Sequence, residues 1–272
     1  MIFVHDKGQM CNNIIQYGQF YAWGREHGHR TMSMRFAYKY RYFRICHTRY
    51  HNFFVYLFAK YASILHLLPV TDFSFVTSSG LKLQEQQLLN HKNIIAKGWI
   101  SHWGDLFFKY KTEIINLFQF DEQVRRRPDL LLNSLPKCDL CVGIHIRRGD
   151  YQRWYNGRYF YNDQQYIGVI KSFLNVHKNQ TIQLFICSND PNLDENVFKN
   201  AFPDKLVSFP NGNPGEDLYL LSQCDYLIGA PSTFTLVASM YRDVPLYWIE
   251  DPNHPLTDAD FGHFNQLFQQ IK

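Results

Sequence analysis

The second half of the chain alternates strand patterns with helix patterns, and this alternation constrains the fold more than any other feature. Residues 140–146 set Leu, Val, Ile and Ile against Cys, Gly and His at period two, as strands do. Further strands are predicted at residues 182–187, 226–230 and 245–249, and helices at residues 166–173, 218–224 and 234–241. Such a chain folds into a parallel sheet with helices on both faces, so we expect an α/β fold.

The N-terminal part begins with the same alternation. Residues 1–5 and 31–36 are predicted strands. Between them the apolar positions recur at the spacing of an amphipathic helix, namely Met10, Ile14, Tyr17 and Tyr21. The loop at residues 6–13 would then lie at the carboxyl end of the first strand, where ligands bind in such sheets.

The stretch RRRPDLLLNSLPK, residues 125–137, is the best candidate for a linker. It combines a charge run, two prolines and a polar break, which are typical of segments between domains. It follows a predicted strand at residues 93–100 and a predicted helix at residues 113–123. We therefore expect two domains, at residues 1–136 and 137–272.

Residues 37–68 are aromatic and basic and follow no single period. One interpretation is a partly buried helical insertion whose Arg and Lys stems pack over aromatic rings. The other is an acceptor-binding or membrane-surface region. A nucleic-acid-binding module is a rival function that would use the basic stretch at residues 35–49. The formal net charge of +4 is too small for a broad nucleic-acid footprint, so we expect no such partner.

The compartment is predicted from cysteines and apolar runs. Six cysteines in a chain of 272 residues do not make a disulfide scaffold, and they fit a reducing compartment. The pair Cys138 and Cys141 lacks the second pair of a zinc ribbon, so we expect no metal there. The N-terminus shows no secretory signal, and the stretch 53–68 is too short and too interrupted to span a bilayer. We expect a cytoplasmic protein, with peripheral contact at the inner face of the membrane left open.

The segment VGIHIRRGDY, residues 142–151, runs from a predicted strand into a loop with two adjacent arginines. Arginine binds phosphate bidentately and keeps its charge, so Arg147 and Arg148 are candidates for a diphosphate clamp. A cation aimed at a leaving diphosphate would stabilise the transition state of a glycosyl transfer. The alternative is that both arginines form ordinary ion pairs, with Asp150 as one of the partners.

A second candidate site is the turn between the predicted strand at 226–230 and the helix that follows. Ser232 and Thr233 stand at that helix's N-terminus, where free N–H groups favour phosphate. Either residue can also serve as an ordinary N-cap, and the two roles are compatible.

These segments resemble those of the α-1,2-fucosyltransferase family. HIRRGDY, residues 145–151, is similar to the family's HxRRGDY motif, and residues 216–241 are similar to its later block with a Ser-Ser/Thr-Phe turn. The related α-1,6-fucosyltransferases have a similar block headed by an aspartate, as Asp217 is here, and protein O-fucosyltransferases are also related. Residues 96–101 and 185–190 resemble further strands of the family.

The resemblance implies a GT-B-like architecture of two Rossmann-like domains facing a cleft. GDP-fucose would be bound mainly by the C-terminal domain, with no cofactor and no divalent metal. By motif position Arg147 would hold the β-phosphate, and His145 and Asp217 would approach the guanosine. Asp190 is a further nucleotide candidate, and the residues that would line the diphosphate and sugar are Ser232, Thr233 and Phe234.

The loop before the first helix departs from the family pattern. Its sequence is GQMCNNIIQY, in which Cys11 stands where the family commonly has glycine. Asn12 and Asn13 keep the polar character of the family's Gly-Asn-Gln run and are candidates for donor contact.

The resemblance implies an inverting transfer of L-fucose from GDP-β-L-fucose to a glycan hydroxyl, with an α-1,2 linkage to galactose expected. The acceptor would be a galactose-terminated or lipid-linked glycan. Asp6, His5 and Asp150 are candidates for taking the hydroxyl proton, and Asp150 can equally be a structural partner of Arg148. Two alternatives stay open. One is a fucosyltransferase of another linkage, such as α-1,6, and the other is a non-catalytic protein that binds a nucleotide sugar or a glycan.

Overall fold

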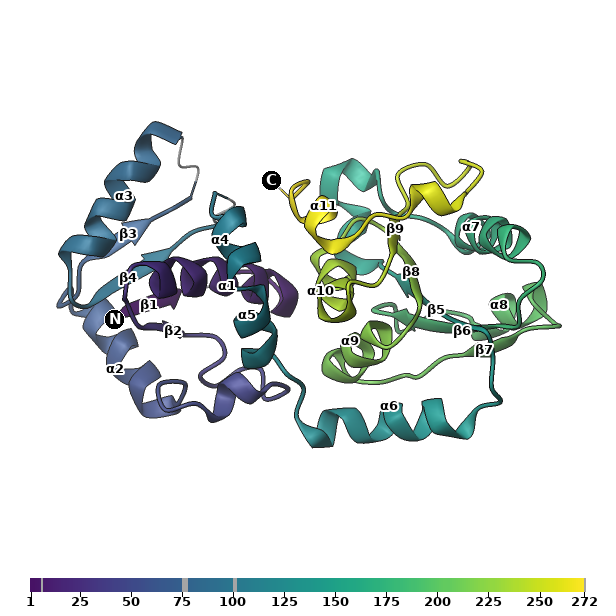
Figure 1. Ribbon diagram of the computed structural model, residues 1–272, viewed down its shortest axis with the longest axis horizontal. Coiled ribbons are helices and arrows are strands. Elements are labelled where there is room, and N and C mark those ends of the chain that lie inside the picture. The colour runs from purple at the N-terminus through teal and green to yellow at the C-terminus, as the bar shows by residue number, and fades with distance from the viewer. Residues whose placement is uncertain (6, 75–77, 100–101, 272) are drawn as a thin grey trace. The chain divides into compact units, whose positions relative to one another are not determined.

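Two α/β units make up the chain. The computed structural model describes residues 1–5, 7–74, 78–99 and 102–271. The N-terminal unit contains residues up to Asp121 and the last residues from Gln269 onward, and the C-terminal unit spans Glu122–Phe268. Each unit has a parallel sheet flanked by helices (Figure 1), which confirms the predicted α/β class.

The N-terminal unit is built on a four-stranded sheet of order β2-β1-β4-β3 in which all pairings are parallel. Its strands are β1 (Ile2–His5), β2 (Thr31–Ser33), β3 (Val70–Asp72) and β4 (Ile94–Lys97). Its helices are α1 (Met10–Glu26), the 3-10 helix η1 (Arg44–His47), α2 (Phe53–Ile64), α3 (Ser78–Asn90), α4 (Gly104–Lys109) and α5 (Lys111–Leu117).

Helix α1 is buried along most of its length, because the sheet lies on one side of it and α4 and α5 on the other. Gly18 allows the close approach of α4, since a Cβ at this position would lie 2.4 Å from the Phe107 ring. Helix α2 packs against the sheet through small side chains. Its Ala59 is buried against Phe3 and Met32 of the sheet.

The C-terminal unit has a five-stranded parallel sheet of order β7-β6-β5-β8-β9. Its strands are β5 (Leu140–Ile146), β6 (Ile182–Ser188), β7 (Leu206–Ser208), β8 (Tyr226–Gly229) and β9 (Leu246–Trp248). Its α-helices are α6 (Glu122–Ser134), α7 (Asp163–Val176), α8 (Glu195–Ala201), α9 (Pro214–Ser222), α10 (Thr233–Arg242) and α11 (Phe264–Phe268). Its 3-10 helices are η2 (Gly149–Gln152), η3 (Trp154–Gly157) and η4 (Asp258–Asp260).

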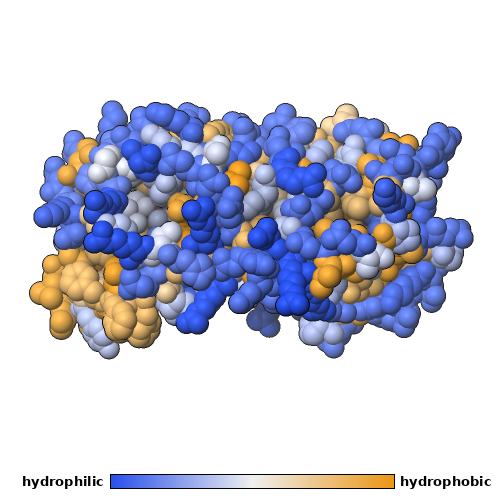
Figure 2. All heavy atoms as spheres, turned by 60° about the horizontal axis from the view of Figure 1, so that its bottom comes forward, coloured by the Kyte–Doolittle hydropathy of each residue, from blue (hydrophilic) through white to orange (hydrophobic). Residues whose placement is uncertain are grey.

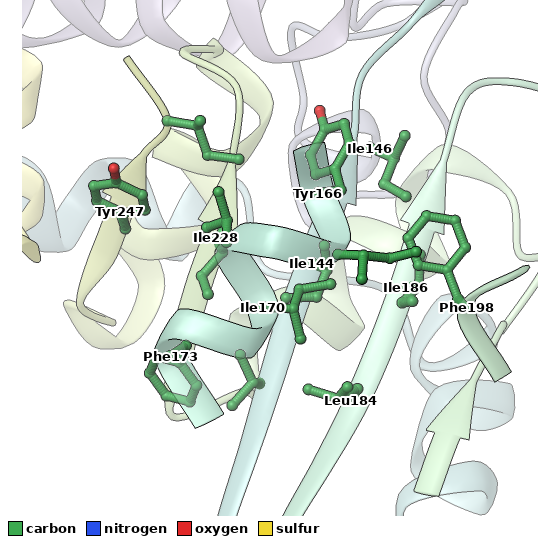
Figure 3. Close-up of a cluster of buried hydrophobic side chains, with 14 of the residues drawn as sticks. Ile144, Ile146, Tyr166, Ile170, Phe173, Leu184, Ile186, Phe198, Ile228 and Tyr247 are labelled. Carbon is green, nitrogen blue, oxygen red and sulfur yellow. The ribbon is translucent and has the colours of Figure 1, made fainter. Parts of the chain in front are cut away.

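Strand β5 is buried on both faces, and its period-two pattern assigns a different partner to each face. Val142, Ile144 and Ile146 pack with α7 and β6 in the main core (Figure 3). Gly143 faces α9 instead, where a Cβ would lie 2.6 Å from the Leu221 side chain. The missing side chain at position 143 therefore lets α9 lie close to the sheet.

Helix α6 corrects the predicted linker. Residues 122–134 are helical and belong to the C-terminal unit, so the units divide after Asp121 rather than at 136/137. The Tyr219 hydroxyl of α9 donates a 2.7 Å hydrogen bond to Asp129 of α6. Pro128 is buried within this helix. The proline and the charge run therefore belong to a packed helix and not to a linker.

Other predictions were less complete. The aromatic and basic residues 37–68 form η1 and α2, and Arg49 lies over the Tyr50 ring at 5.7 Å, as the insertion interpretation expects. The predicted helix at 113–123 is divided between α5 and α6. Position 100 of the predicted strand 93–100 lies outside the described residues. Besides α6, the strands and α-helices that the sequence patterns did not predict include β3, β7, α3, α4, α8 and α11.

Two helical glycines give opposite expectations for stability. Gly18→Ala should lower the free energy of unfolding by about 1–3 kcal/mol, because the new methyl group overlaps the Phe107 ring. Gly168→Ala in α7 should raise it by about 0.5–1 kcal/mol, because no atom lies within 4 Å of its Cβ position. Urea unfolding followed by circular dichroism measures both. A stable Gly18→Ala variant would contradict the tight α1–α4 contact.

Candidate functional site

The candidate site lies where the strand order of the C-terminal sheet reverses. From β5 the chain proceeds outward to β6 and β7, and it then returns to β8 on the other side of β5. Open parallel sheets bind ligands at such a switch point, beyond the carboxyl ends of the strands. The carboxyl ends of β5 and β8 are in register, because His145 of β5 pairs with Gly229 of β8.

Arg147 comes directly after β5, at the carboxyl end of the strand. Its Nη2 contacts both carboxylate oxygens of Asp150, at 2.7 and 2.9 Å, and its Cζ lies 5.3 Å from the centre of the Tyr151 ring. The Asp150 side chain is 58% exposed, whereas that of Arg147 is 16% exposed. The ion pair is therefore open to solvent on its acidic side, where an anionic ligand can replace Asp150.

Arg148 has a different environment. Its Nη2 forms an ion pair with Asp163 at the start of α7, and its Nη1 contacts Asp190 at 3.1 Å. Burial lowers the pKa of its guanidinium, but the two carboxylates outweigh burial and raise it. Asn189 also accepts a 2.7 Å hydrogen bond from the Arg148 amide. Arg148 thus holds the loop to β6 and α7, and both it and Asp190 already have charged partners.

His145 lies beneath the site in a fully buried position. Its ring stacks on Phe234 of α10, with centroids 4.6 Å apart and planes 20° from parallel. Burial and the charge of Arg147 lower its pKa to about 3, so the imidazole is neutral under physiological conditions. Its Nδ1 is buried and has no hydrogen-bond partner among the described residues. His145 therefore offers a free hydrogen-bonding atom rather than a charge.

Helix α10 begins at the carboxyl end of β8. Ser232 is its N-cap, and the Ser232 hydroxyl accepts a 3.3 Å hydrogen bond from the Thr235 amide. Thr233 is the first helical residue, so it belongs to the first turn, where the helix N–H groups point away from the helix. The Tyr151 hydroxyl donates a 2.5 Å hydrogen bond to the Pro231 carbonyl and ties the β5 loop to this turn.

Asp217 lies in the first turn of α9 on the same face of the sheet. It is next to Cys187, which pairs with His145 across β5 and β6. Burial raises the pKa of Asp217 to about 6, although the Gly212 amide, the Cys187 thiol and the charge of Arg127 act in the opposite direction. Its Oδ1 is buried and has no hydrogen-bond partner within the described part of the chain. A buried acceptor of this kind is costly unless a ligand supplies a donor.

A pocket of about 340 Å³ lies between α6 and the loop that follows β7, and Glu216, the neighbour of Asp217 in the sequence, lines it. Its volume is that of a small-ligand site. Arg127 donates to the Pro210 carbonyl at 3.0 Å and lies 3.7 Å from Glu216, so α6 forms one wall. The other lining residues include Pro128, Leu131, Ser208, Phe209 and Gly212.

The remaining predicted residues belong to the N-terminal unit. Asn12 and Asn13 lie on the first turn of α1, and Asn13 is buried and donates to the Gly8 carbonyl at 3.4 Å. His5 is exposed at the end of β1, where partial desolvation and the charges of Arg35, Lys7 and Lys97 lower its pKa. Asp6 lies outside the described residues.

Sequence reasoning missed three residues that build these loops. Tyr151 belongs to the recognised motif, but nothing in its spacing pointed to a bond with Pro231. Asp163 was not singled out in the sequence, although it begins α7 and forms an ion pair with Arg148. In the N-terminal unit Gln16 binds the loops after β1 and β4, by accepting from the Lys7 amide and donating to the Gly98 carbonyl.

The described residues contain neither a cluster of potential metal ligands nor a helix that could cross a membrane. No group of three or more His, Cys, Asp or Glu side chains there is placed to hold a metal ion. The sulfurs of Cys138 and Cys141 lie 3.5 Å apart as free thiols. Within the same residues, no helix combines the length and the apolarity that crossing a bilayer requires.

Comparison with known proteins agrees with this geometry. Residues 36–243 match the model of glycosyl transferase family 11, a stretch that includes the β5 loop, α9 and the α10 turn. The chain belongs to glycosyl transferase family 11. A search of curated protein sequences finds no match to it.

Solved structures resemble this family 11 chain over most of its length. A variant of Arabidopsis thaliana FUT1 in complex with GDP is 13% identical, with a TM-score of 0.65 over 96% of this chain and 73% of that one. POFUT1 in complex with GDP-fucose is 11% identical, with a TM-score of 0.59 over 89% and 93%. The NodZ α-1,6-fucosyltransferase soaked with GDP-fucose is 13% identical, with a TM-score of 0.54 over 96% and 98%. This likeness establishes a shared GT-B fold.

The buried carboxylate of Asp217 makes a testable contribution to stability. Because its pKa is raised to about 6, the folded state binds more protons than the unfolded state between about pH 4 and 6, and stability falls as pH rises through that window. Asp217→Asn should abolish this loss and raise the free energy of unfolding at pH 7.5 by up to about 2 kcal/mol. Urea unfolding at pH 4.5 and 7.5 measures it.

The control for this experiment is Glu250→Gln, which changes an exposed carboxylate of the same unit. Its stability should keep the pH dependence of the unmodified chain. If Asp217→Asn also keeps that dependence, the carboxylate is not desolvated as the structure indicates.

Proposed function

We propose that this family 11 chain is an inverting fucosyltransferase that moves L-fucose from GDP-β-L-fucose to a glycan hydroxyl, forming an α-1,2 linkage to galactose. The reaction is a single displacement. The acceptor oxygen forms a bond to the anomeric carbon as the bond from that carbon to the diphosphate breaks. The acceptor hydroxyl loses its proton, and GDP leaves with the bonding electrons.

One observation carries the proposal. A cation, a helix N-terminus and two unpartnered buried atoms meet at one switch point. Arg147 and the first turn of α10 are joined through Tyr151 and Pro231. His145 and Asp217 face the same side of the sheet and keep one acceptor-capable atom each without a partner. A nucleoside diphosphate supplies anionic oxygens for the first pair and polar groups for the second.

The carboxylate of Asp217 favours guanine over other bases. Guanine presents two adjacent donors, N1–H and the 2-amino group, which together match the two oxygens of a carboxylate. Gly212 lines the pocket, and a Cβ at its position would lie 2.7 Å from the unpartnered Oδ1 of Asp217. Adenine offers its ring nitrogen N1 as an acceptor at the equivalent place, so it would leave the carboxylate repelled and unpaired.

The diphosphate would be held by Arg147 and the amides of α10. Negative charge grows on the leaving oxygen as the sugar bond breaks, so a fixed guanidinium stabilises the transition state more than the ground state. The same cation and N–H groups supply charge compensation that other glycosyl transfers obtain from a metal ion. We therefore propose that the reaction needs no divalent metal.

The candidates for taking the acceptor proton differ in their surroundings. Both oxygens of Asp150 contact Arg147, so Asp150 would have to release the guanidinium before it could accept a proton. Partial desolvation, followed by the charges of nearby Arg and Lys residues, lowers the pKa of His5 and so favours its neutral, proton-accepting form. His145 is too weak a base, because its pKa is about 3.

The linkage and the requirement for turnover separate this proposal from its two alternatives. The HIRRGDY motif supports α-1,2, whereas the likeness to NodZ extends only to the fold. The test is incubation with GDP-fucose and a panel of galactosides and glucosaminides, followed by mass and linkage analysis. An α-1,2-fucosylated galactoside supports the proposal. An α-1,6 product would replace the linkage, and donor binding without any product would indicate a non-catalytic binding protein.

Donor choice is the first prediction of this proposal. GDP and GDP-fucose should raise the melting temperature, because they bind the folded state, whereas ADP and UDP-sugars should not. Excess EDTA should leave the shift with GDP unchanged. Asp217→Asn should reduce the shift with GDP, because it replaces one acceptor by an NH₂ donor. An equal shift with UDP-glucose would overturn the base assignment, and loss of the GDP shift in EDTA would overturn metal independence.

The two adjacent arginines give a matched pair for the mechanism. Arg147→Ala should lower kcat by about a hundredfold or more with little change in melting temperature, because it removes one preorganised cation from an open ion pair. Arg147→Lys should restore little, since a point charge does not reproduce the bidentate fork. Arg148→Ala should instead lower stability by about 2 kcal/mol or more, because it leaves Asp163 and Asp190 facing each other without a cation.

Steady-state kinetics and thermal melting on the same purified proteins distinguish these roles. Near-normal kcat in Arg147→Ala would remove Arg147 from the mechanism. If Arg148→Ala were as stable as the unmodified chain, its two ion pairs would not hold the loop.

A further inference from the structure

Helix α2 has the reverse of the usual amphipathic arrangement. The residues that it buries against the sheet are small, Ala59 and Ala62, whereas its outward stripe carries large apolar side chains. The stripe recurs at the spacing of one helix face and is 55–81% exposed, at Phe54, Phe58, Tyr61 and Leu65. Figure 2 shows apolar side chains gathered on this part of the surface of the N-terminal unit.

The apolar surface extends beyond the helix on both sides. Phe53 and Ile64 are 53% and 58% exposed beside the stripe, and Leu67 just after the helix is 71% exposed. We call this set, with the stripe, the α2 face. A water-soluble helix normally exposes its polar side chains and buries its large apolar ones. Apolar patches of this kind mark contact sites.

The sequence segment that contains α2 carries charges of one sign. No Asp or Glu occurs between Glu26 and Asp72, whereas this segment contains seven Lys and Arg residues. The rest of the chain has 21 basic and 24 acidic residues, so the positive formal net charge of the protein comes from this segment. Lys60 lies on α2 itself, 6.0 Å from the centre of the Tyr61 ring, and the charge of Arg35 acts on Tyr56 of the same helix.

This charge pattern selects among the surfaces that could cover the α2 face. A second copy of the chain would bring the same basic segment against itself across a twofold axis, and like charges would then oppose each other. An anionic lipid bilayer offers the opposite charge in its headgroup layer and an apolar layer directly beneath it. Aromatic and aliphatic side chains on one face with lysine and arginine around them are the composition of interfacial helices.

We propose that the α2 face docks the protein on an anionic lipid bilayer, with the large apolar side chains of α2 entering the acyl boundary and the surrounding Lys and Arg residues contacting the headgroups. The inference is independent of the transferase proposal, because it concerns lipid binding by the N-terminal unit. Loss of transferase activity would leave it untouched.

The experiment measures co-sedimentation of the full chain with vesicles of phosphatidylcholine alone or mixed with phosphatidylglycerol. The chain should bind the mixed vesicles and release from them as salt is raised, because salt screens the headgroup contacts. Phe54→Ser combined with Phe58→Ser should weaken binding by more than about tenfold, since two exposed phenylalanines lose their place in the acyl layer. Lys60→Gln should weaken binding to mixed vesicles by a few-fold, in line with about 1 kcal/mol per surface cation.

The matched control is Leu83→Ser combined with Leu89→Ser on α3 of the same unit, where both side chains are also exposed. This variant should bind vesicles as the unmodified chain does. Circular dichroism melting of each variant shows whether it folds, and exposed positions should leave the melting temperature within a few degrees.

Three results would overturn the proposal. They are no vesicle binding by the unmodified chain, equal losses in the α2 and α3 variants, and binding to phosphatidylcholine alone that salt does not change. Sedimentation velocity without lipid supplies a further check. A dimer that disappears in the Phe54→Ser, Phe58→Ser variant would assign the α2 face to a second copy of the chain instead.

Discussion

The seven residues of strand β5 pack against a helical layer on each face of the sheet and lead into the candidate site. The geometry of the C-terminal unit depends on how these contacts are divided between the two faces. The isoleucines and valine of β5 pack with α7, while Gly143 leaves room for α9 on the other face. The same alternation places His145 on the α9 and α10 side, where Phe234 stacks on it. The close approach of two helices and the position of the buried imidazole thus follow from one period-two pattern.

The sequence patterns predicted the long elements of the fold because those elements bury a regular apolar stripe. Strands β5 and β6 and helices α1, α7 and α10 have such stripes, and each lies close to its predicted range. Strands β3 and β7 have three residues each, too few to show a period. Helix α6 was interpreted as a linker because most of its side chains are charged or exposed and it contains Pro128. Only a narrow side of the helix is buried, where it packs against α9.

The candidate site was predictable where chemistry and strand ends coincide, as at Arg147 and Ser232. The sequence could not distinguish the roles of the two arginines, because those roles depend on carboxylates that approach from other elements. Asp163 and Asp190 reach Arg148 from α7 and from the end of β6, whereas Arg147 pairs with Asp150 of the loop itself. Likewise nothing in the local sequence of Asp217 indicates that folding leaves one of its oxygens without a donor.

The anchoring of Arg148 has a consequence for how the HIRRGDY segment can be reused. Its loop is held by an ion pair to Asp163, by another to Asp190 and by the exchange of hydrogen bonds with Asn189. The segment is therefore one part of a four-residue assembly, three parts of which lie outside the motif. A motif search that ignores these positions would accept chains that cannot hold the loop in this shape. A graft of the loop onto another parallel sheet would need all three partners transferred with it.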